Sequence, residues 1–163
     1  MIPFFSLQIK LVSTVEYWYI ILEENTMGVF KEEITLENTE DRGFAKRGYI
    51  KESEIRTLKV EAMPDTGAWT LVINDDIRQK LGLTIEETSR STLADGKTDT
   101  YDVTEGVKIR WRDRSTILPA VVVPDAKEIL LGALPLEAMD LMVDPVHGCL
   151  VGVHGDQPLH VIY

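Results

Sequence analysis

The tripeptide Asp65-Thr66-Gly67, followed by Ala68, contains the residue types in this sequence that are best suited to chemistry. Asp can accept hydrogen bonds from the amides that follow it and Gly tolerates unusual backbone angles, so an isolated match is also good turn chemistry. A carboxylate held at such a turn can instead take a proton from water or, when protonated, donate one. The segments around the triplet indicate which of these two roles, a structural turn or a reactive carboxyl group, is the better interpretation.

A period of two dominates the sequence from Phe30 onward. Apolar and charged residues alternate over 58–62, directly before the triplet, and again over 107–111, so each segment predicts a strand with one buried face. Residues 117–123 are nearly all apolar and predict a central strand covered on both faces. Short segments rich in Val, Ile and Thr, separated by turn residues, are typical of an all-β barrel or sandwich.

Helices are expected to be few and short. Asn74 predicts the N-cap of a helix over Asp75–Leu81, which Gly82 would end. A second helix is expected to begin near Pro135, a residue favoured at the first helical position, and to run through Leu136–Leu141. Such short helices are marginal alone, so both must pack against the sheet.

Two further segments predict loops and turns. Residues 37–48 are charged and contain two glycines, which is typical of a loop. Asp95-Gly96 lies between two strand-like segments and predicts a two-residue β-hairpin turn. We find no internal repeat and no low-complexity tract.

In this order and spacing, the segments from about Glu33 to Val151 resemble the retropepsin-like aspartic proteases, the single-domain retroviral-type branch of that class. The resemblance implies an all-β fold, a closed retropepsin-type (acid protease) barrel with one or two short helices. It also implies a catalytic carboxylate on the triplet, a hairpin flap over a peptide substrate, and a hydrophobic-hydrophobic-Gly element that supports the active-site loop. The positions that match are the catalytic Asp65, the active-site loop residues Thr66, Gly67 and Ala68, the flap residues Leu93, Ala94, Asp95 and Gly96, and the supporting residues Leu130, Leu131 and Gly132.

Hydrolysis of a peptide bond by carboxyl groups alone needs two of them. One takes a proton from water while the other donates one to the carbonyl oxygen, and two carboxyls a few ångströms apart share a single proton. The chain holds no second Asp-Thr-Gly or Asp-Ser-Gly, so the pair must form between Asp65 of two copies in a C2 homodimer. Gly67 would aim its amide at the carboxylates, and Thr66 would hydrogen-bond across the pair as its family counterpart does.

Pro64 and Ala133 depart from the family pattern, and Ala68 occupies a position at which some members have a hydroxyl side chain. Pro64 stands where an apolar residue with a free amide is usual, so we expect the strand before Asp65 to end early. Ala133 stands where retroviral members often have an arginine that ties the dimer, so dimerisation would need other contacts, such as the terminal segments. Ala68 cannot donate the hydrogen bond that a hydroxyl would give to the ionised carboxylate, so we expect a less acidic working pH.

Several alternative interpretations stay open. On the same fold, the protein could be a catalytically inactive dimeric peptide-binding or scaffold module whose loop, distorted by Pro64, cannot activate water. Trp69 and Trp111 could line a pocket or pack in the core, and Trp69 is the better pocket candidate because it adjoins Ala68. A metal site is not expected at the C-terminal group of His147, Cys149, His154 and His160, because no pair has a recognised ligand spacing.

Composition limits the remaining choices. The 163 residues suit one domain, and the formal net charge of −10 argues against nucleic acid or an anionic membrane as a partner. One cysteine, Cys149, excludes an intrachain disulfide and fits a reducing compartment. The apolar start is interrupted by Lys10 and Glu16 and lacks signal-peptide features, so we expect an N-terminal extension over residues 1–26, a protease domain over 27–163, no cofactor, and a cytoplasmic location.

Overall fold

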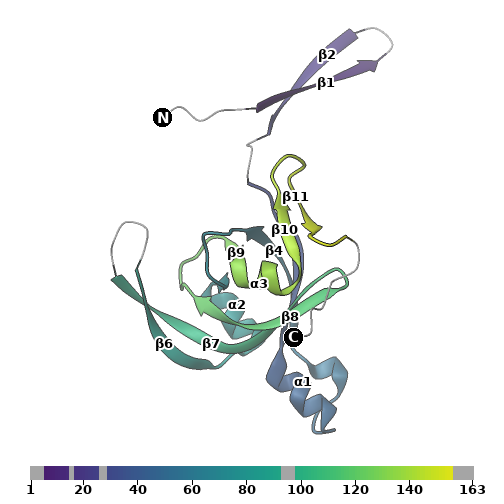
Figure 1. The fold of residues 1–163 in the computed structure, drawn as a ribbon. Coiled ribbons are helices and arrows are strands. Elements are labelled where there is room, and N and C mark those ends of the chain that lie inside the picture. The colour runs from purple at the N-terminus through teal and green to yellow at the C-terminus, as the bar shows by residue number, and fades with distance from the viewer. Residues whose placement is uncertain (1–5, 15–16, 26–28, 93–97, 156–163) are drawn as a thin grey trace.

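Six strands form a closed barrel, and short helices lie around it (Figure 1). The computed structural model describes residues 6–14, 17–25, 29–92 and 98–155. Around the barrel the order is β3-β4-β9-β5-β8-β7, and antiparallel pairing of β3 with β7 closes the ring. The strands are β3 Glu32–Asn38, β4 Thr57–Pro64, β5 Leu71–Ile73, β7 Thr98–Trp111, β8 Arg114–Val122 and β9 Ile129–Leu131. The expected all-β closed barrel is therefore confirmed.

The other strands lie outside this ring. β6, Ile85–Thr92, pairs antiparallel with the first half of β7 and extends from the barrel as a long hairpin (Figure 1). β10, Leu141–Asp144, pairs with β11, Cys149–Gly152, in a sheet of two strands. β1, Ser6–Thr14, pairs with β2, Tyr17–Asn25, in another. The described part of the expected N-terminal extension thus consists of two paired strands.

The alternating segments bury the faces that the sequence predicts. On β7, Val107, Ile109 and Trp111 are buried, and on β4 Ala62 is buried while its charged neighbours are exposed. Ile117 corrects the prediction for 117–123, because it is 57% exposed and β8 is buried mainly on its inner face. β8 does lie centrally, between β5 and β7, but an apolar run alone does not show which outward side chains a neighbour covers.

The first predicted helix forms as expected. α2, Asp75–Leu81, is capped by the Asn74 side chain, which accepts a hydrogen bond from the Ile77 amide at 3.0 Å. Gly82 ends it in the left-handed conformation, with φ of 60°. Ile77 and Leu81 bury the apolar side of this helix against the barrel.

The second helix is displaced from its predicted position. α3 spans Ala133–Ala138 and has Gly132 at its N-cap, so it begins two residues before Pro135. The prediction through Leu141 was wrong, because Met139 ends the helix and Asp140 has a positive φ of 56°. Leu141 already belongs to β10.

The prediction of a loop over 37–48 was wrong, because this segment holds a third helix. α1 spans Thr39–Lys46, and the short 3-10 helix η1 follows at Glu52–Glu54. Buried Asn38 accepts a hydrogen bond from the Asp41 amide and donates to the Leu81 carbonyl, so it caps α1 and ties it to the end of α2. Across the described ranges, no helix is long and apolar enough to cross a bilayer.

A buried arginine holds the C-terminal part of the described chain against the barrel. The Arg114 side chain is 3% exposed and donates to the carbonyls of Met139, Asp140 and Gly155 and to the Asp140 carboxylate. The other Asp140 oxygen lies 2.6 Å from His154 Nδ1. The hydrogen bonds from Arg114 and then His154 lower the pKa of Asp140 from 3.8 to about 2.

We expect Asp140→Asn to remove a pH-dependent part of the stability. The lowered pKa means that ionised Asp140 stabilises the fold above about pH 3.8 and loses this effect as the pH falls toward 2. Asn also tolerates the positive φ at this position. Urea unfolding at pH 5, 3 and 2 should show that the wild type is more stable at pH 5 and that the difference shrinks with acid. A difference that stays constant would contradict this role, since all other carboxylates are common to both proteins.

Candidate active site

Asp65 stands at the first position after β4, in a loop that leads into β5. The Gly67 amide donates to Asp65 Oδ1 at 2.8 Å, and the Ala68 amide donates to the Asp65 carbonyl at 3.1 Å. A Cβ on Gly67 would stand 3.1 Å from Asp65 Oδ1, so a side chain there would crowd the carboxylate. The loop therefore turns tightly around the carboxyl group and aims a backbone amide at it.

The strand β9 lies between the two strands that carry this loop. It runs parallel to β4 and antiparallel to β5, and Leu131 is the register partner of both Pro64 and Leu71. The Asp65 amide donates to the Leu131 carbonyl at 3.0 Å. Pro64 is the last residue of β4, so the expected early end of the strand was wrong. Pro64 has no amide hydrogen, so the amide of Asp65 makes the backbone hydrogen bond that links this end of β4 to β9.

The residues after Leu131 hold the far side of the loop. The Ala133 amide donates to the Ala68 carbonyl at 2.9 Å, and the Leu134 amide donates to the Trp69 carbonyl at 3.1 Å. Gly132 has no room for a side chain, because a Cβ would lie 2.7 Å from the Ala68 carbonyl oxygen and in contact with the Thr70 backbone. The segment from Leu131 to Leu134 thus fixes the loop through the backbone.

The open side of the loop bears the groups that could meet a partner or substrate. Thr66 and Gly67 are exposed, Asp65 is half-buried, and Trp69 is 59% exposed. Within the described residues, neither Asp65 Oδ2 nor the Thr66 hydroxyl has a hydrogen-bond partner. One carboxylate oxygen is therefore held by the loop, and the other is free to act.

The structure brings together two of the three groups of residues singled out in the sequence. The active-site loop and Leu130, Leu131 and Gly132 are neighbours, with Leu131 buried and Leu130 half-buried. The flap residues Leu93, Ala94, Asp95 and Gly96 lie outside the described residues. The strands on either side of them pair as a hairpin as far as Thr92 and Thr98.

The structure also places the residues of the alternative interpretations. Trp111 is buried and donates from Nε1 to Glu32 at 3.1 Å. His147 and His154 each contact an aspartate, and Cys149 is half-buried at the start of β11. His160 lies outside the described residues. Among those that are described, no group of three His, Cys, Asp or Glu residues could hold a metal ion.

Thr70 is a supporting residue that the sequence did not reveal. It is buried, and its hydroxyl donates to the Pro119 carbonyl of β8 at 2.9 Å, which ties the end of the loop to the barrel wall. Its signal was weak, because a threonine inside an apolar segment is ordinary for a strand. Only the parallel pairing of β5 with β8 brings Pro119 close to it.

Known protein families and solved structures include some that are similar to this chain. Residues 52–134, just over half of the chain, match the family model described as aspartyl protease. The chain therefore belongs to the aspartyl protease family. Among solved structures, it is similar to a retropepsin-like aspartic protease from Rickettsia conorii, with 16% identity, a TM-score of 0.43, and coverage of 88% of this chain and 91% of that chain. No curated protein matches the sequence.

Proposed function

We propose that the protein is a homodimeric aspartic endopeptidase that hydrolyses peptide bonds with water activated by two Asp65 side chains, one from each copy. The observation that carries this proposal is the Asp65 loop, which holds one carboxylate oxygen by the Gly67 amide and leaves the other unpartnered among the described residues. The chain has one such triplet, so a monomer would hold half of the catalytic pair. Membership of the aspartyl protease family supports the same reaction class.

The chemistry follows from bringing the two carboxyl groups together. With one proton shared, the ionised member takes a proton from the attacking water, while the protonated member donates to the carbonyl oxygen of the substrate. In the second step the carboxyl that gained a proton from water gives it to the peptide nitrogen, and the carbon–nitrogen bond breaks. The other carboxylate takes a proton from a hydroxyl of the tetrahedral carbon, which restores the single shared proton. An extended substrate would lie across the dyad beneath the hairpin of β6 and β7, with alternate side chains on opposite sides.

The hairpin of β10 and β11 is our candidate for the contact between copies. Met142, Val146 and Val153 are all at least half exposed, although they are large and apolar. Among the described strands, β10 and β11 pair only with each other, so each has a free edge. α3 follows the loop-supporting strand β9 and contacts β10, so this hairpin is linked through α3 to the strand that supports the active-site loop. A second copy would cover the apolar surface and supply the missing Asp65.

The test combines dimer mass with cleavage. The protein is incubated with fluorescent casein and with a peptide library over a range of concentrations, while light scattering reports its mass. We expect cleavage, with specific activity that falls on dilution as dimers dissociate. A stable monomer that cleaves peptides would overturn the intermolecular dyad. Peptide binding without cleavage by a stable dimer would instead identify an inactive binding module.

Met142→Glu tests the proposed contact surface. A charge buried at an apolar interface should raise the dimer dissociation constant by about tenfold or more, because burying a Met side chain contributes about 1.5–3 kcal/mol. Ile117→Glu is the matched control, since Ile117 is similarly exposed but lies on β8 in the barrel wall. Analytical ultracentrifugation measures both. Dissociation by the control and not by Met142→Glu would exclude the hairpin as the interface.

Ala68→Ser should shift the pH dependence of cleavage. A serine hydroxyl next to the loop carboxylate can donate to its ionised form and so favours that form at lower pH. The acidic limb of the plot of kcat/KM against pH should therefore move to lower pH than in the wild type. Ala68→Val, which adds bulk without a donor, serves as the control. An unchanged acidic limb in Ala68→Ser would count against a hydroxyl effect at this position.

A further inference from the structure

The outer face of β7 carries a row of positive charges. Because Val107, Ile109 and Trp111 fill the core, the residues between them point outward. Arg42 and Lys46 of α1 add two more cations near Lys108. Burial and the charges of Arg42, Arg110 and Lys46 lower the pKa of Lys108, whereas Glu37, which pairs with Arg42, raises it. We call this group, together with Arg112 in the turn after β7, the cationic stripe; its other members are Arg42, Lys46, Lys108 and Arg110.

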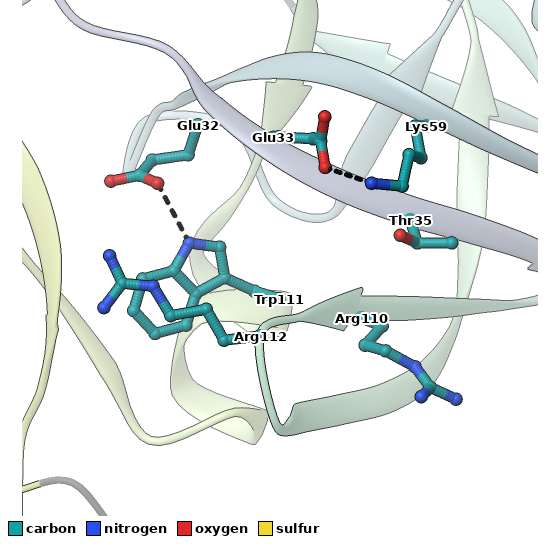
Figure 2. Close-up of a pocket in the computed structure, with 7 residues that line it drawn as sticks. All are labelled: Glu32, Glu33, Thr35, Lys59, Arg110, Trp111 and Arg112. Atoms are coloured by element: carbon teal, nitrogen blue, oxygen red, sulfur yellow. Dashed lines mark hydrogen bonds and ion pairs between the residues drawn. The ribbon is translucent and has the colours of Figure 1, made fainter.

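A cavity of about 360 Å³ opens beside the stripe, between β3, β4 and the end of β7 (Figure 2). Its two carboxylates are already engaged. Glu33 pairs with Lys59 at 2.7 Å, and Glu32 accepts hydrogen bonds from Trp111 Nε1 and from the Leu150 amide, both at 3.1 Å. Arg110 extends away from both of them and forms no ion pair within the described residues, although its charge helps to lower the pKa of Glu37 (Figure 2). The positive charge of Arg110 is therefore not neutralised by the carboxylates of the cavity.

Arg112 occupies a position at which glycine would be less strained. It lies between β7 and β8 at a φ of 51°, in the left-handed region that L side chains rarely adopt. Its guanidinium lies 4.2 Å from the centroid of the Trp111 ring, and Figure 2 shows the two side chains stacked. Stacking fixes the plane of the guanidinium and leaves its N–H edges available to an anion. The Arg112 side chain is thus positioned to bind an anion, although its backbone conformation is strained.

We propose that the cationic stripe binds an extended acidic segment of another protein, with Asp or Glu at alternate positions. Side chains two residues apart on a strand are separated by about 6.8 Å, and this spacing is the same along β7 and along an extended ligand. Successive acidic side chains could therefore meet Lys108 and Arg110 on β7. Arg112 lies beyond the end of this strand, in the turn to β8, so it adds a cation whose position the strand spacing does not set. None of the residues 65–68 lines the cavity, so this site is separate from the active-site loop.

A nucleic acid fits the same surface less well. The chain as a whole has a formal net charge of −10, which opposes a continuous phosphate backbone. Two cations on the strand and one in the turn after it neutralise few phosphates, and Glu32 and Glu33 border the cavity. A short acidic peptide carries fewer negative charges, so Glu32 and Glu33 repel it less than they would a nucleic acid, and it is the ligand that we favour.

The test is a binding measurement on the full chain carrying Asp65→Asn, which prevents cleavage. Fluorescence anisotropy compares a labelled peptide of alternating Glu and Thr with an isomer in which all Glu residues precede all Thr residues. We expect tighter binding of the alternating peptide and weaker binding as salt is raised. Arg110→Gln combined with Arg112→Gly should weaken binding by about tenfold, since each exposed ion pair contributes about threefold. Glycine suits the positive φ, so this variant should fold.

Lys127→Gln is the matched control, because it also removes an exposed cation but lies between β8 and β9, outside the stripe and the cavity. Its affinity should stay within about twofold of the parent. Equal affinity for the two peptides, equal loss in the control, or no binding at low salt would overturn the proposal. Tighter binding of a single-stranded oligonucleotide than of the alternating peptide would also overturn it, because it would indicate a general polyanion surface.

Discussion

Replacing Asp65 with asparagine should abolish peptide hydrolysis while leaving the fold intact. In a homodimer this one substitution removes both carboxyl groups, so the general base and the general acid are lost together. We expect kcat/KM to fall by at least about 10³-fold, since each of these roles contributes about 10²–10⁴-fold. The loop should keep its shape, because the amide oxygen of asparagine can still accept the hydrogen bond from Gly67.

The measurement pairs cleavage of a quenched fluorescent peptide with thermal unfolding. Asp125→Asn is the control, since it makes the same chemical change at an exposed turn residue after β8. It should cleave like the wild type. Full cleavage by Asp65→Asn would end the protease proposal, and a large fall in its melting temperature would show that Asp65 acts on the fold instead.

Mixing subunits tests whether the catalytic pair is shared between copies. When the wild type is allowed to exchange with a ninefold excess of Asp65→Asn chains, most wild-type chains acquire an inactive partner. Activity per wild-type chain should then fall to about one tenth, because random pairing leaves about that share of wild-type homodimers. Activity that stays proportional to the wild-type chains present would place both catalytic groups within one subunit. The Asp125→Asn protein, mixed in the same excess, should cause no such fall.

The parts of the fold that the sequence predicts well depend on local signals. The alternation over 58–62 and 107–111 has one cause, the two-residue period of a strand, and the structure buries the predicted faces. The helix Asp75–Leu81 also carries its own start and stop, in Asn74 and Gly82. Because these signals act over a few residues, no knowledge of distant contacts was needed.

The helix α1 shows what local signals miss. It is charged and contains a glycine, so no apolar periodicity indicates a buried face. Its stability comes from distant partners. Asp41 accepts two hydrogen bonds from the Arg56 guanidinium, each of 2.7 Å, and Asn38 reaches the end of α2. Neither contact can be read from the spacing of residues 37–48 alone.

The same distinction applies to the candidate site and to the cationic stripe. The Asp65 triplet and the Leu131-Gly132 pair were visible as short motifs, but their contact depends on β9 entering between β4 and β5. Likewise, Arg42 and Lys108 are far apart in the sequence. Pairing of Glu37 with Lys108 in the β3–β7 register, together with α1, brings the two cations to one face. A sequence pattern can therefore identify single residues of such sites, but the strand topology determines which of these residues lie together.

Gly132→Ala should have a large effect on stability, although it adds a single methyl group. The new Cβ would stand 2.7 Å from the Ala68 carbonyl oxygen and 2.8 Å from the Thr70 nitrogen, and it would also contact the Thr70 carbonyl oxygen. These are backbone atoms that cannot rotate away, so β9 must move from the loop. We expect a loss of about 3 kcal/mol in the free energy of unfolding, at the upper end of the usual cost of overpacking.

Gly43→Ala is the control that separates crowding from the general effect of replacing a glycine. Gly43 lies in α1, and a Cβ there would meet no atom within 4 Å. Since alanine favours a helix by about 0.5–1 kcal/mol over glycine, this variant should be more stable than the wild type. Denaturant unfolding should therefore give shifts of opposite sign. The Gly132→Ala shift should be accompanied by lost cleavage, because β9 itself accepts the amide hydrogen bond of Asp65 through the Leu131 carbonyl, and this bond would be lost as β9 moves away from the loop. Equal stability of the two variants would mean that the loop tolerates displacement of β9, and the backbone support argued for Asp65 would be wrong.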